Sequence, residues 1–506
     1  MRVLLIDPPF YRLIGYFNRY YPLGLAYLAS VLRKEGHDVL IYDADCNINP
    51  SKMDFSILEL SYPIYLDCLR DENNIVWKEL QSILQAFSPD IVGITVWTSF
   101  AASAFRVAQI CKEYKINLPV IMGGPHITIK ADEVLKICTD VDFLIKGEGE
   151  NTFSILLNLL DKSIRLNDNE ISDPDNLLRM IKGISYRKNG EVIHQPLEEF
   201  VDDLDTIPFP ARDLLVNHAL YDSEDMGLLM TSRGCPYSCT YCATSIWGKK
   251  VRNRSVYNVI QEIKQITETY GTKQFAFKDD SFTINRHRVI ELCNRIKQEK
   301  IKINWDCNTR VDCIDEELLD NMKEAGCNGI KVGIETGSER IMRLINKNTT
   351  LEECMNAAKL LKKAGIHWTG YFMIGLPTET KDDMQKTLEF MRKLEPDFAS
   401  ISVYEPFPGT AMFDLGIEKG LAKKESSLSD FFEISPKYYY IKDMNRRIDT
   451  MSNQEFKDLE SEIKEAFHKY NMGIPRLAKR LKSRRRLYIR EPKTIWSDFK
   501  KFLGWL

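Results

Sequence analysis

Three cysteines stand close together near the middle of the chain, in the segment Cys235-Pro-Tyr-Ser-Cys239-Thr-Tyr-Cys242. Thiolate sulfur is a soft ligand that suits iron, and three thiolates can hold three irons of a [4Fe–4S] cluster. The fourth iron is then left without a protein ligand. Because an open iron can chelate the amino and carboxylate groups of a small molecule and pass it one electron, this spacing predicts a redox-active cluster.

A structural zinc ion is the main alternative for a three-cysteine loop. No histidine or fourth cysteine stands near Cys242 at zinc-finger spacing to complete a tetrahedral site, which favours the cluster. The other cysteines are scattered, and we expect reduced, apolar core residues rather than disulfides in a chain without an export signal. They are Cys46, Cys68, Cys111, Cys138, Cys293, Cys307, Cys313, Cys327 and Cys354.

Length and composition indicate an ordinary soluble protein with more than one domain. A chain of 506 residues exceeds the size of a single hydrophobic core, so two or three domains are expected. It is 44% hydrophobic and 28% charged with a formal net charge of −3, and this balance does not call for a nucleic-acid partner. The opening MRVLLIDPPF is too short for a secretory signal, and we find no uninterrupted apolar run of ~18 residues. We therefore expect a cytoplasmic protein with no transmembrane segment.

The elements that position the cysteines come from two stretches of βα alternation. The first predicts a doubly wound (Rossmann- or flavodoxin-like) α/β domain over residues 1–162, with a polar, aromatic insertion at about 47–85. Its five expected strands lie in RVLLID, DVLIYDAD, DIVGITVW, PVIMGG and VDFLIKGEGE. Residues 163–225 are expected to be a linker with a small sheet, made by a hairpin that turns at Asn189-Gly190.

The second stretch predicts a partial (β/α)6 TIM-like barrel over residues 226–415, whose functional groups should lie at the C-terminal ends of its strands. Its six expected strands lie in GLLMTSRG, QFAFKDD, INWDCNTR, IKVGIET, WTGYFMIG and ASISVYEP. Residues 416–506 are expected to be helical. Their basic end, 478–501, favours a solvated helix that covers the barrel over a membrane-surface or nucleic-acid patch.

In this setting the chain resembles the radical S-adenosylmethionine (SAM) superfamily, whose signature is this cysteine spacing with an aromatic residue, here Tyr241, before the last cysteine. The resemblance implies reductive cleavage of SAM to methionine and a 5′-deoxyadenosyl radical. Taken singly, the matching residues at later strand ends are equally typical of solvated ends, helix caps and turns. The resemblance implies SAM contacts for Asp279 and Asp280 (amino end), Arg310 (carboxylate), Glu335 (ribose) and Gly375 (adenine).

Three loops at strand ends of the front domain have glycines that let a bulky ligand lie against the backbone and hydroxyls that can bond its amides. Tight turns are the alternative interpretation. The candidate residues are Thr98, Ser99, Gly123, Gly124, His126, Gly147 and Glu148.

Over roughly residues 1–415 the chain resembles the cobalamin-dependent radical SAM proteins, on PLGLAYLASVLRKEGHDV, GGPHIT, GEGE and PFPGT. This resemblance implies bound cobalamin. The Asp-x-His-x-x-Gly pattern of methionine synthase is absent after the first strand, so the cobalt should lack a histidine from that motif. We expect His126 to bond its own backbone or the cofactor tail rather than the cobalt.

The leading functional hypothesis is a class B radical SAM methyltransferase-like enzyme, which would methylate an unactivated carbon or phosphorus through a 5′-deoxyadenosyl radical and methylcobalamin. Alternatives are a cobalamin-dependent radical SAM oxidative cyclase or rearrangement enzyme, a methylthiotransferase, and a non-catalytic cobalamin sensor or iron–sulfur scaffold. The resemblance implies a flavodoxin- or ferredoxin-type electron donor. We expect a small-molecule or lipid-like substrate in a pocket near Tyr404, Glu405 and Phe407.

Overall fold

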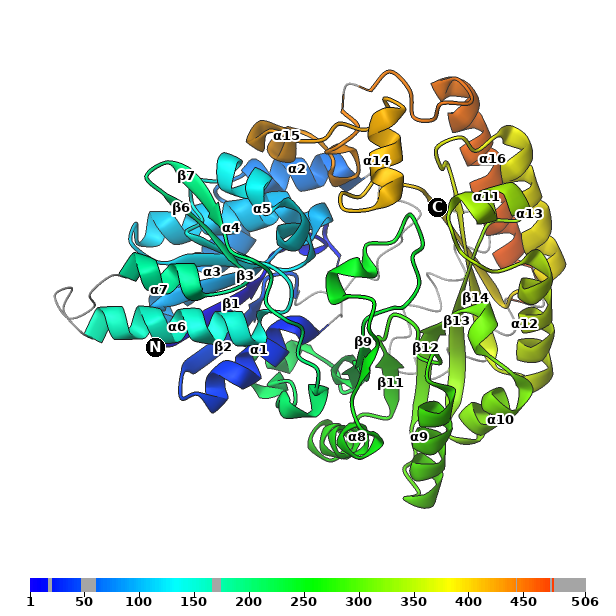
Figure 1. Ribbon diagram of the computed structural model, residues 1–506, viewed down its shortest axis with the longest axis horizontal. Helices are drawn as coiled ribbons and strands as arrows, with labels where there is room; N and C mark the ends of the chain where they lie inside the picture. The colour runs from blue at the N-terminus through cyan, green and yellow to red at the C-terminus, as the bar shows by residue number, and fades with distance from the viewer. Residues whose placement is uncertain (17–20, 47–60, 166–173, 443, 474–475, 477–506) are drawn as a thin grey trace.

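The computed structural model describes residues 1–16, 21–46, 61–165, 174–442, 444–473 and 476. Figure 1 shows two α/β units side by side, with the segments that follow the second unit running back across both.

The front unit is a parallel sheet with helices on both faces. Its strands are β1 (Arg2–Asp7), β2 (Asp38–Asp43), β3 (Ile91–Thr95), β4 (Val120–Gly123), β5 (Phe143–Ile145), β6 (Ile184–Lys188) and β7 (Glu191–His194). Its helices are α1 (Leu23–Lys34), α2 (Tyr62–Arg70), α3 (Ile75–Phe87), α4 (Ala101–Tyr114), α5 (Pro125–Ile137), α6 (Gly149–Arg165) and α7 (Pro174–Met180). Among described strands the order is β2-β1-β3-β4-β5-β6-β7. The first five are parallel, so the strand order reverses between β1 and β3, where doubly wound domains bind ligands.

The hairpin turns at Asn189 and Gly190 as expected, and both residues have positive φ (49° and 83°). The expectation that it forms a small sheet of its own is wrong, because β6 pairs with β5 and extends the front sheet. Ile184 and Tyr186 are buried against this sheet, which explains why the hairpin docks there.

Part of the expected polar insertion is helical. α2 and α3 cover the front sheet between residues 62 and 87, while residues 47–60 lie outside the described part of the chain. The side chain of Asn74 caps α3 by accepting a hydrogen bond from the Val76 amide (3.0 Å). Val76, Trp77 and Leu80 give α3 the apolar face that packs on the front core.

The second unit is an open parallel sheet of six strand–helix units, as the sequence predicts. Its strands are β8 (Leu228–Leu229), β11 (Gln274–Phe277), β12 (Asn304–Thr309), β13 (Cys327–Glu335), β14 (His367–Ile374) and β15 (Phe398–Val403). Its helices are α8 (Val256–Tyr270), α9 (Arg286–Gln298), α10 (Glu316–Glu324), α11 (Glu339–Leu344), α12 (Leu351–Ala364) and α13 (Lys381–Leu394). In the described chain, neighbouring strands of β15-β14-β13-β12-β11-β8 are parallel throughout.

The helices that follow these strands begin at capping side chains, which fixes the loops at the C-terminal edge of the sheet. Ser338, Thr350 and Thr380 each accept a hydrogen bond from a backbone amide of the first turn. Thr350 and Thr380 are part of reciprocal capping boxes. The loops that hold the candidate site are therefore anchored on their helix side.

The last described segments connect the two units. They contain α14 (Ala411–Glu418), α15 (Leu428–Glu433) and α16 (Asn453–Asn471). α15 packs against α2 and α4 of the front unit, and α16 packs against α13 and β15 (Figure 1). The basic stretch 478–501 lies outside the described residues. None of the described helices is both long and apolar enough to cross a membrane.

Candidate functional site

The cysteine loop lies between the two units and is closed at its base (Figure 1). Two short antiparallel strands, β9 (Ser232–Arg233) and β10 (Arg252–Asn253), pair where the loop begins and ends. The Cys235 amide donates to the Gly248 carbonyl (3.3 Å). Gly234 has φ +92°, and a Cβ there would lie 2.3 Å from the Lys250 carbonyl oxygen. Only glycine permits this crossing, so Gly234 fixes the entry into the loop.

The three cysteines of this loop differ in burial from most of the others. Cys235, Cys239 and Cys242 are half-buried and form no disulfide, whereas the remaining nine are buried except for Cys68 and Cys313. Among described residues, no three His, Cys, Asp or Glu side chains are grouped so that they could hold a metal ion. In a [4Fe–4S] cluster each thiolate binds its own iron, so the ligands need not converge on one point. The donor set fits this cluster by its chemistry.

Two cations stand beside the cysteine loop. Nη1 of Arg310 lies 3.8 Å from Sγ of Cys239, and its guanidinium stacks 3.5 Å from the ring centre of Tyr237. Burial raises the pKa of the Cys239 thiol, while the charges of Lys347 and Arg310 act in the opposite direction. These cations favour the thiolate that a metal needs. Arg310 is already bound by Asp312 (2.9 and 3.0 Å), so only part of its guanidinium could meet a SAM carboxylate.

Glu335 ends β13 in a strained conformation beside the cysteine loop. Its φ is +71°, and the pairing of β13 with β14 is irregular at this point. Lys347 forms an ion pair with Glu335 (2.9 Å) and lies 3.4 Å from the Tyr241 hydroxyl. Burial and the charge of Glu335 raise the pKa of Tyr241. Lys347 is a site residue that the sequence reasoning missed, because it lies in a loop twelve positions after its partner.

The two acids after β11 have different surroundings. Asp279 is buried, and its carboxylate accepts hydrogen bonds from the hydroxyl and amide of Thr231 and the amide of Ser232. The protein itself therefore uses Asp279 to hold the start of the cysteine loop. Asp280 is exposed at the same strand end, and its proposed contact with the SAM amino group remains a prediction.

The loop after β14 is tied down by a buried glutamate. Oε2 of Glu379 accepts from the amides of Gly375 (2.6 Å) and Leu376 (3.0 Å). Gly375 has φ +83°, and a Cβ there would lie 2.9 Å from the ring of Phe456 in α16. Gly375 thus lets the loop after β14 pack against α16.

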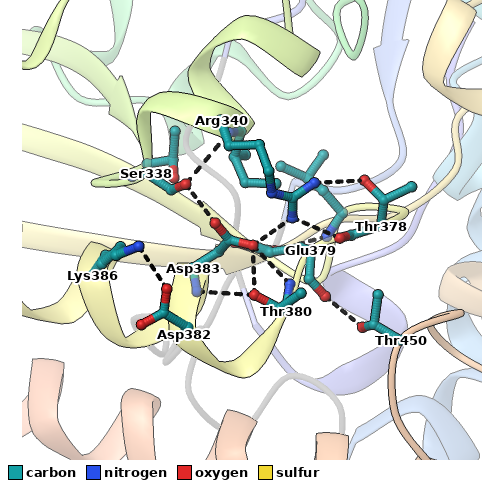
Figure 2. A network of polar contacts seen from close by, with 12 residues as sticks. Ser338, Arg340, Thr378, Glu379, Thr380, Asp382, Asp383, Lys386 and Thr450 are labelled. Carbon is teal, nitrogen blue, oxygen red and sulfur yellow. Dashed lines mark hydrogen bonds and ion pairs between the residues drawn. The ribbon is translucent and has the colours of Figure 1, made fainter.

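A polar network joins this loop to the one that follows β13 (Figure 2). Asp383, in the first turn of α13, accepts hydrogen bonds from Ser338 (2.5 Å), Arg340 and the Thr380 amide (3.0 Å). Burial opposes ionisation of Asp383, but these donors hold its pKa well below the usual range. The loops that contain Glu335 and Gly375 are consequently held in one arrangement.

The buried carboxyl group of Glu379 should make the free energy of unfolding depend on pH. Burial raises its pKa to about 8, whereas an unfolded glutamate titrates at about 4.3. Between these values the native state keeps a proton that the unfolded state loses, so stability falls as pH rises. Relative to Glu379→Gln, the wild-type free energy of unfolding should fall by about 1.4 kcal/mol per pH unit between pH 5.5 and 7.5. Urea titrations of both proteins check this, and parallel pH curves would contradict it.

The predicted cobalamin loops meet at the C-terminal edge of the front sheet. Nδ1 of His126 lies 3.1 Å from the Thr98 hydroxyl, and its Nε2 is buried with no hydrogen-bond partner among the described residues. Burial lowers the pKa of His126 to about 3, so the ring is neutral. A buried polar atom without a protein partner fits a contact with a polar group of a bound cofactor. The His126 backbone amide donates to the carbonyl of Val96, which follows β3 (3.0 Å). The expectation that the side chain bonds its own backbone is not met, because its Nδ1 contacts the Thr98 hydroxyl instead.

The three candidate glycines of this edge differ in what surrounds them, and Gly124 is the one against which another backbone packs closely. Gly124 has φ +100°, and a Cβ there would lie 3.1 Å from the backbone of Val96. Gly147 has φ +76°, and its amide donates to the Thr128 hydroxyl (3.0 Å). Gly123 has ordinary space around it, and Ser99 is half-buried in the turn after β3.

The Glu148 side chain is already engaged by other side chains of the protein. It is buried and forms ion pairs with Arg233 and Arg252, which flank the cysteine loop. Its predicted cobalamin contact is thus replaced by contacts with the second unit. The residues next to Glu148 in the sequence do not indicate this role, because more than 80 residues separate Glu148 from its partner Arg233.

A small pocket lies where the front unit, the end of β15 and the C-terminal segment meet. Of the residues expected near the substrate, Glu405 and Phe407 line it, whereas Tyr404 is buried. Its lining consists of Thr98, Glu405, Pro406, Phe407, Pro436, Tyr439, Tyr440 and Ile441.

Comparison with known proteins agrees with this arrangement. Residues 14–157 match the B12 binding domain, and residues 229–391 match the Radical SAM superfamily. An uncharacterized methyltransferase of Pyrococcus horikoshii is 36% identical over 427 residues, which are 83% of this chain and 84% of the relative. The chain belongs to the cobalamin-binding radical SAM family.

Other members of the family lie further away. An anaerobic magnesium-protoporphyrin IX monomethyl ester cyclase of Rubrivivax gelatinosus is 28% identical over 423 residues, 82% of this chain and 69% of the relative. The radical SAM methyltransferase TsrM from Kitasatospora setae, solved with cobalamin and a [4Fe–4S] cluster, has a TM-score of 0.65 at 18% identity, with 83% of this chain and 79% of TsrM covered. The family and the predicted fold class are thus confirmed, and the cofactors of the family are those predicted: a [4Fe–4S] cluster, SAM and cobalamin.

Proposed function

We propose that this radical SAM protein is a methyltransferase that methylates an unactivated carbon or phosphorus of a small molecule. The observation that carries the proposal is the position of the cysteine loop. Its segment Thr244–Trp247 lies against α5, the helix at the C-terminal edge of the front sheet, and the hydroxyl of its Tyr241 lies 3.4 Å from Lys347, which forms an ion pair with Glu335 of the second sheet. Similarity to a methyltransferase of Pyrococcus horikoshii supports it.

When bound, the cluster supplies an electron for SAM cleavage and the cobalamin supplies a methyl carrier. The chain itself contributes ligands and fixed charges. Cys235, Cys239 and Cys242 would hold the cluster, and Arg310 beside them favours the thiolate state. Glu335, oriented by Lys347, is the proposed partner of the SAM ribose.

The remaining site assignments follow the same placement. Tyr241, Asp280 and Gly375 would bound the SAM site, and Thr98, Gly124 and Gly147 the cobalamin site. The pocket at Glu405 and Phe407 opens beside Thr98, so we propose that a small or lipid-like substrate enters there. We further propose a cytoplasmic location and a flavodoxin- or ferredoxin-type electron donor.

The decisive experiment is product analysis of the anaerobically reconstituted protein with SAM, hydroxocobalamin, a reductant and candidate substrates. We expect about four irons and one corrinoid per chain, and a product heavier by one methyl together with 5′-deoxyadenosine and S-adenosylhomocysteine. Formation of 5′-deoxyadenosine without S-adenosylhomocysteine would refute methyl transfer. Failure to cleave SAM at all would instead favour a sensor or scaffold.

A radical oxidative cyclase is the second candidate, and similarity to the cyclase of Rubrivivax gelatinosus favours it. The same assay separates the two, because a cyclised product is lighter by hydrogen and lacks the added methyl. A methylthiotransferase needs a second three-cysteine cluster in front. Cys46, Cys111 and Cys138 of the front unit are buried instead, which gives that alternative no support.

A further inference from the structure

Glu148 of the front unit binds both ends of the cysteine loop. Arg233 ends β9 and Arg252 begins β10, and the two residues face each other in the strand pair. Oε1 of Glu148 lies 3.0 Å from Nη1 of Arg233, and both Glu148 oxygens lie 2.9 Å from guanidinium nitrogens of Arg252. Arg233 also binds Glu150 (2.6 Å). We call these four side chains the interdomain clasp.

The interdomain clasp is buried, with side chains between 1% and 8% exposed. A bidentate arginine–carboxylate pair, such as Arg252 with Glu148, fixes the relative orientation of the two side chains as well as their distance. Separating buried partners leaves a desolvated charge, so the cysteine loop cannot shift against the front unit without a large penalty.

Two further contacts extend the interdomain clasp to its surroundings. Arg252 also donates to the carbonyl of Trp247, five residues earlier in the cysteine loop (3.2 Å). The Val201 amide of the linker donates to Glu148 (2.9 Å). The cysteine loop and the linker are therefore both bonded to the Glu148 carboxylate of the front unit.

Glu148 follows β5 at the C-terminal edge of the front sheet, where the predicted cobalamin loops meet. We call this edge of the sheet the cobalamin edge. Gly147, one residue earlier, is hydrogen-bonded to Thr128 in α5, the helix that begins directly after Gly124. The same short loop thus contacts the cobalamin edge through its backbone and the cysteine loop through its acidic side chains.

We propose that the interdomain clasp sets the position of the cysteine loop relative to the cobalamin edge, and that Glu148 is a positioning residue that couples SAM cleavage to product formation. The coupling rests on the proposed function. The positioning of the cysteine loop is independent of the proposed function.

The test compares Glu148→Gln and Glu150→Gln in the full-length reconstituted protein. Hydrogen exchange of the 234–251 segment should become at least 10-fold faster in Glu148→Gln and change less in Glu150→Gln, where Glu148 still pairs with both arginines. The electron paramagnetic resonance spectrum of the reduced cluster should shift. The ratio of 5′-deoxyadenosine to final product should rise at least 10-fold, and Glu148→Asp, which keeps the charge, should restore part of the coupling.

Glu262 supplies the matched control, because it is equally buried between two arginines, Arg212 and Arg254, but outside the cysteine loop. Glu262→Gln should lower stability while leaving the cluster spectrum and the product ratio unchanged. If Glu148→Gln only loosens both units as Glu262→Gln does, or leaves exchange of 234–251 unchanged, the positioning role is refuted. A shifted spectrum and faster loop exchange without any methylated product would retain positioning and refute the methyltransferase.

Discussion

Replacing Cys239 with alanine is expected to abolish SAM cleavage, with a fall of at least about 1,000-fold, because the cluster performs the electron transfer that no side chain can replace. Cys239 is the predicted ligand whose Sγ lies 3.8 Å from Arg310, and the charges of Arg310 and Lys347 both act on its thiol. Without its thiolate one iron loses its protein ligand, and the charges of Arg310 and Lys347 lose their partner. Iron content per chain and 5′-deoxyadenosine formation under anaerobic conditions measure the effect.

Cys313→Ala is the control for this prediction. Cys313 is another half-buried thiol of the same region, with its Sγ 3.2 Å from the hydroxyl of Tyr237 in the cysteine loop. It should keep its iron and most of its activity, since it is outside the ligand set. Equal loss of iron in the two variants would show that the cluster assignment is wrong.

The second large effect is expected from a single methyl group, in Gly333→Ala. A Cβ at Gly333 would lie 2.4 Å from Oε1 of Glu335 and 2.8 Å from Nζ of Lys347. Both atoms are the far ends of flexible side chains, so the Glu335 carboxylate and the Lys347 ammonium must shift from their present positions, and we expect this shift to weaken the proposed contact of Glu335 with SAM. Loss of one charged contact of about 1.5–3 kcal/mol corresponds to a rise of about 10- to 150-fold in the KM for SAM.

Gly329→Ala on the same strand is the matched control. Its added methyl meets only Cβ of Asp306 at 3.2 Å and a more distant backbone oxygen, a contact that a small shift relieves. The KM of this variant should stay near the wild-type value. If both alanine variants raised KM equally, the effect would come from the strand and not from the Glu335–Lys347 pair.

Features set by neighbouring residues could be predicted from the sequence, and those set by distant partners could not. The strands of both units are apolar runs bounded by turns, and the Asn189-Gly190 turn is decided by φ alone. That the resulting hairpin joins β5 depends on an edge formed 40 residues earlier. α3 has a local signal, the cap at Asn74 followed by an apolar face, which the expectation of a polar, aromatic insertion overlooked.

The same division holds within the site. The cysteine spacing is local, and the radical SAM family that it indicates is confirmed. Lys347 and the arginines of the interdomain clasp owe their roles to ion pairs across loops or units, which periodicity does not encode. Asp279 shows the reverse case, because a strand-end acid that suits a ligand is instead bonded by the amides of Thr231 and Ser232 and by the Thr231 hydroxyl.

The path of the chain through the two units bears on how the protein unfolds. Phe413, Phe431 and Tyr439 of the C-terminal segment belong to the core of the front unit, whereas Phe456 and Phe467 belong to the core beneath the second sheet. That second core also includes Val3 and Leu5 of β1. Unfolding of either unit would expose apolar side chains of the other to solvent. We therefore expect a single cooperative thermal transition for both units rather than two.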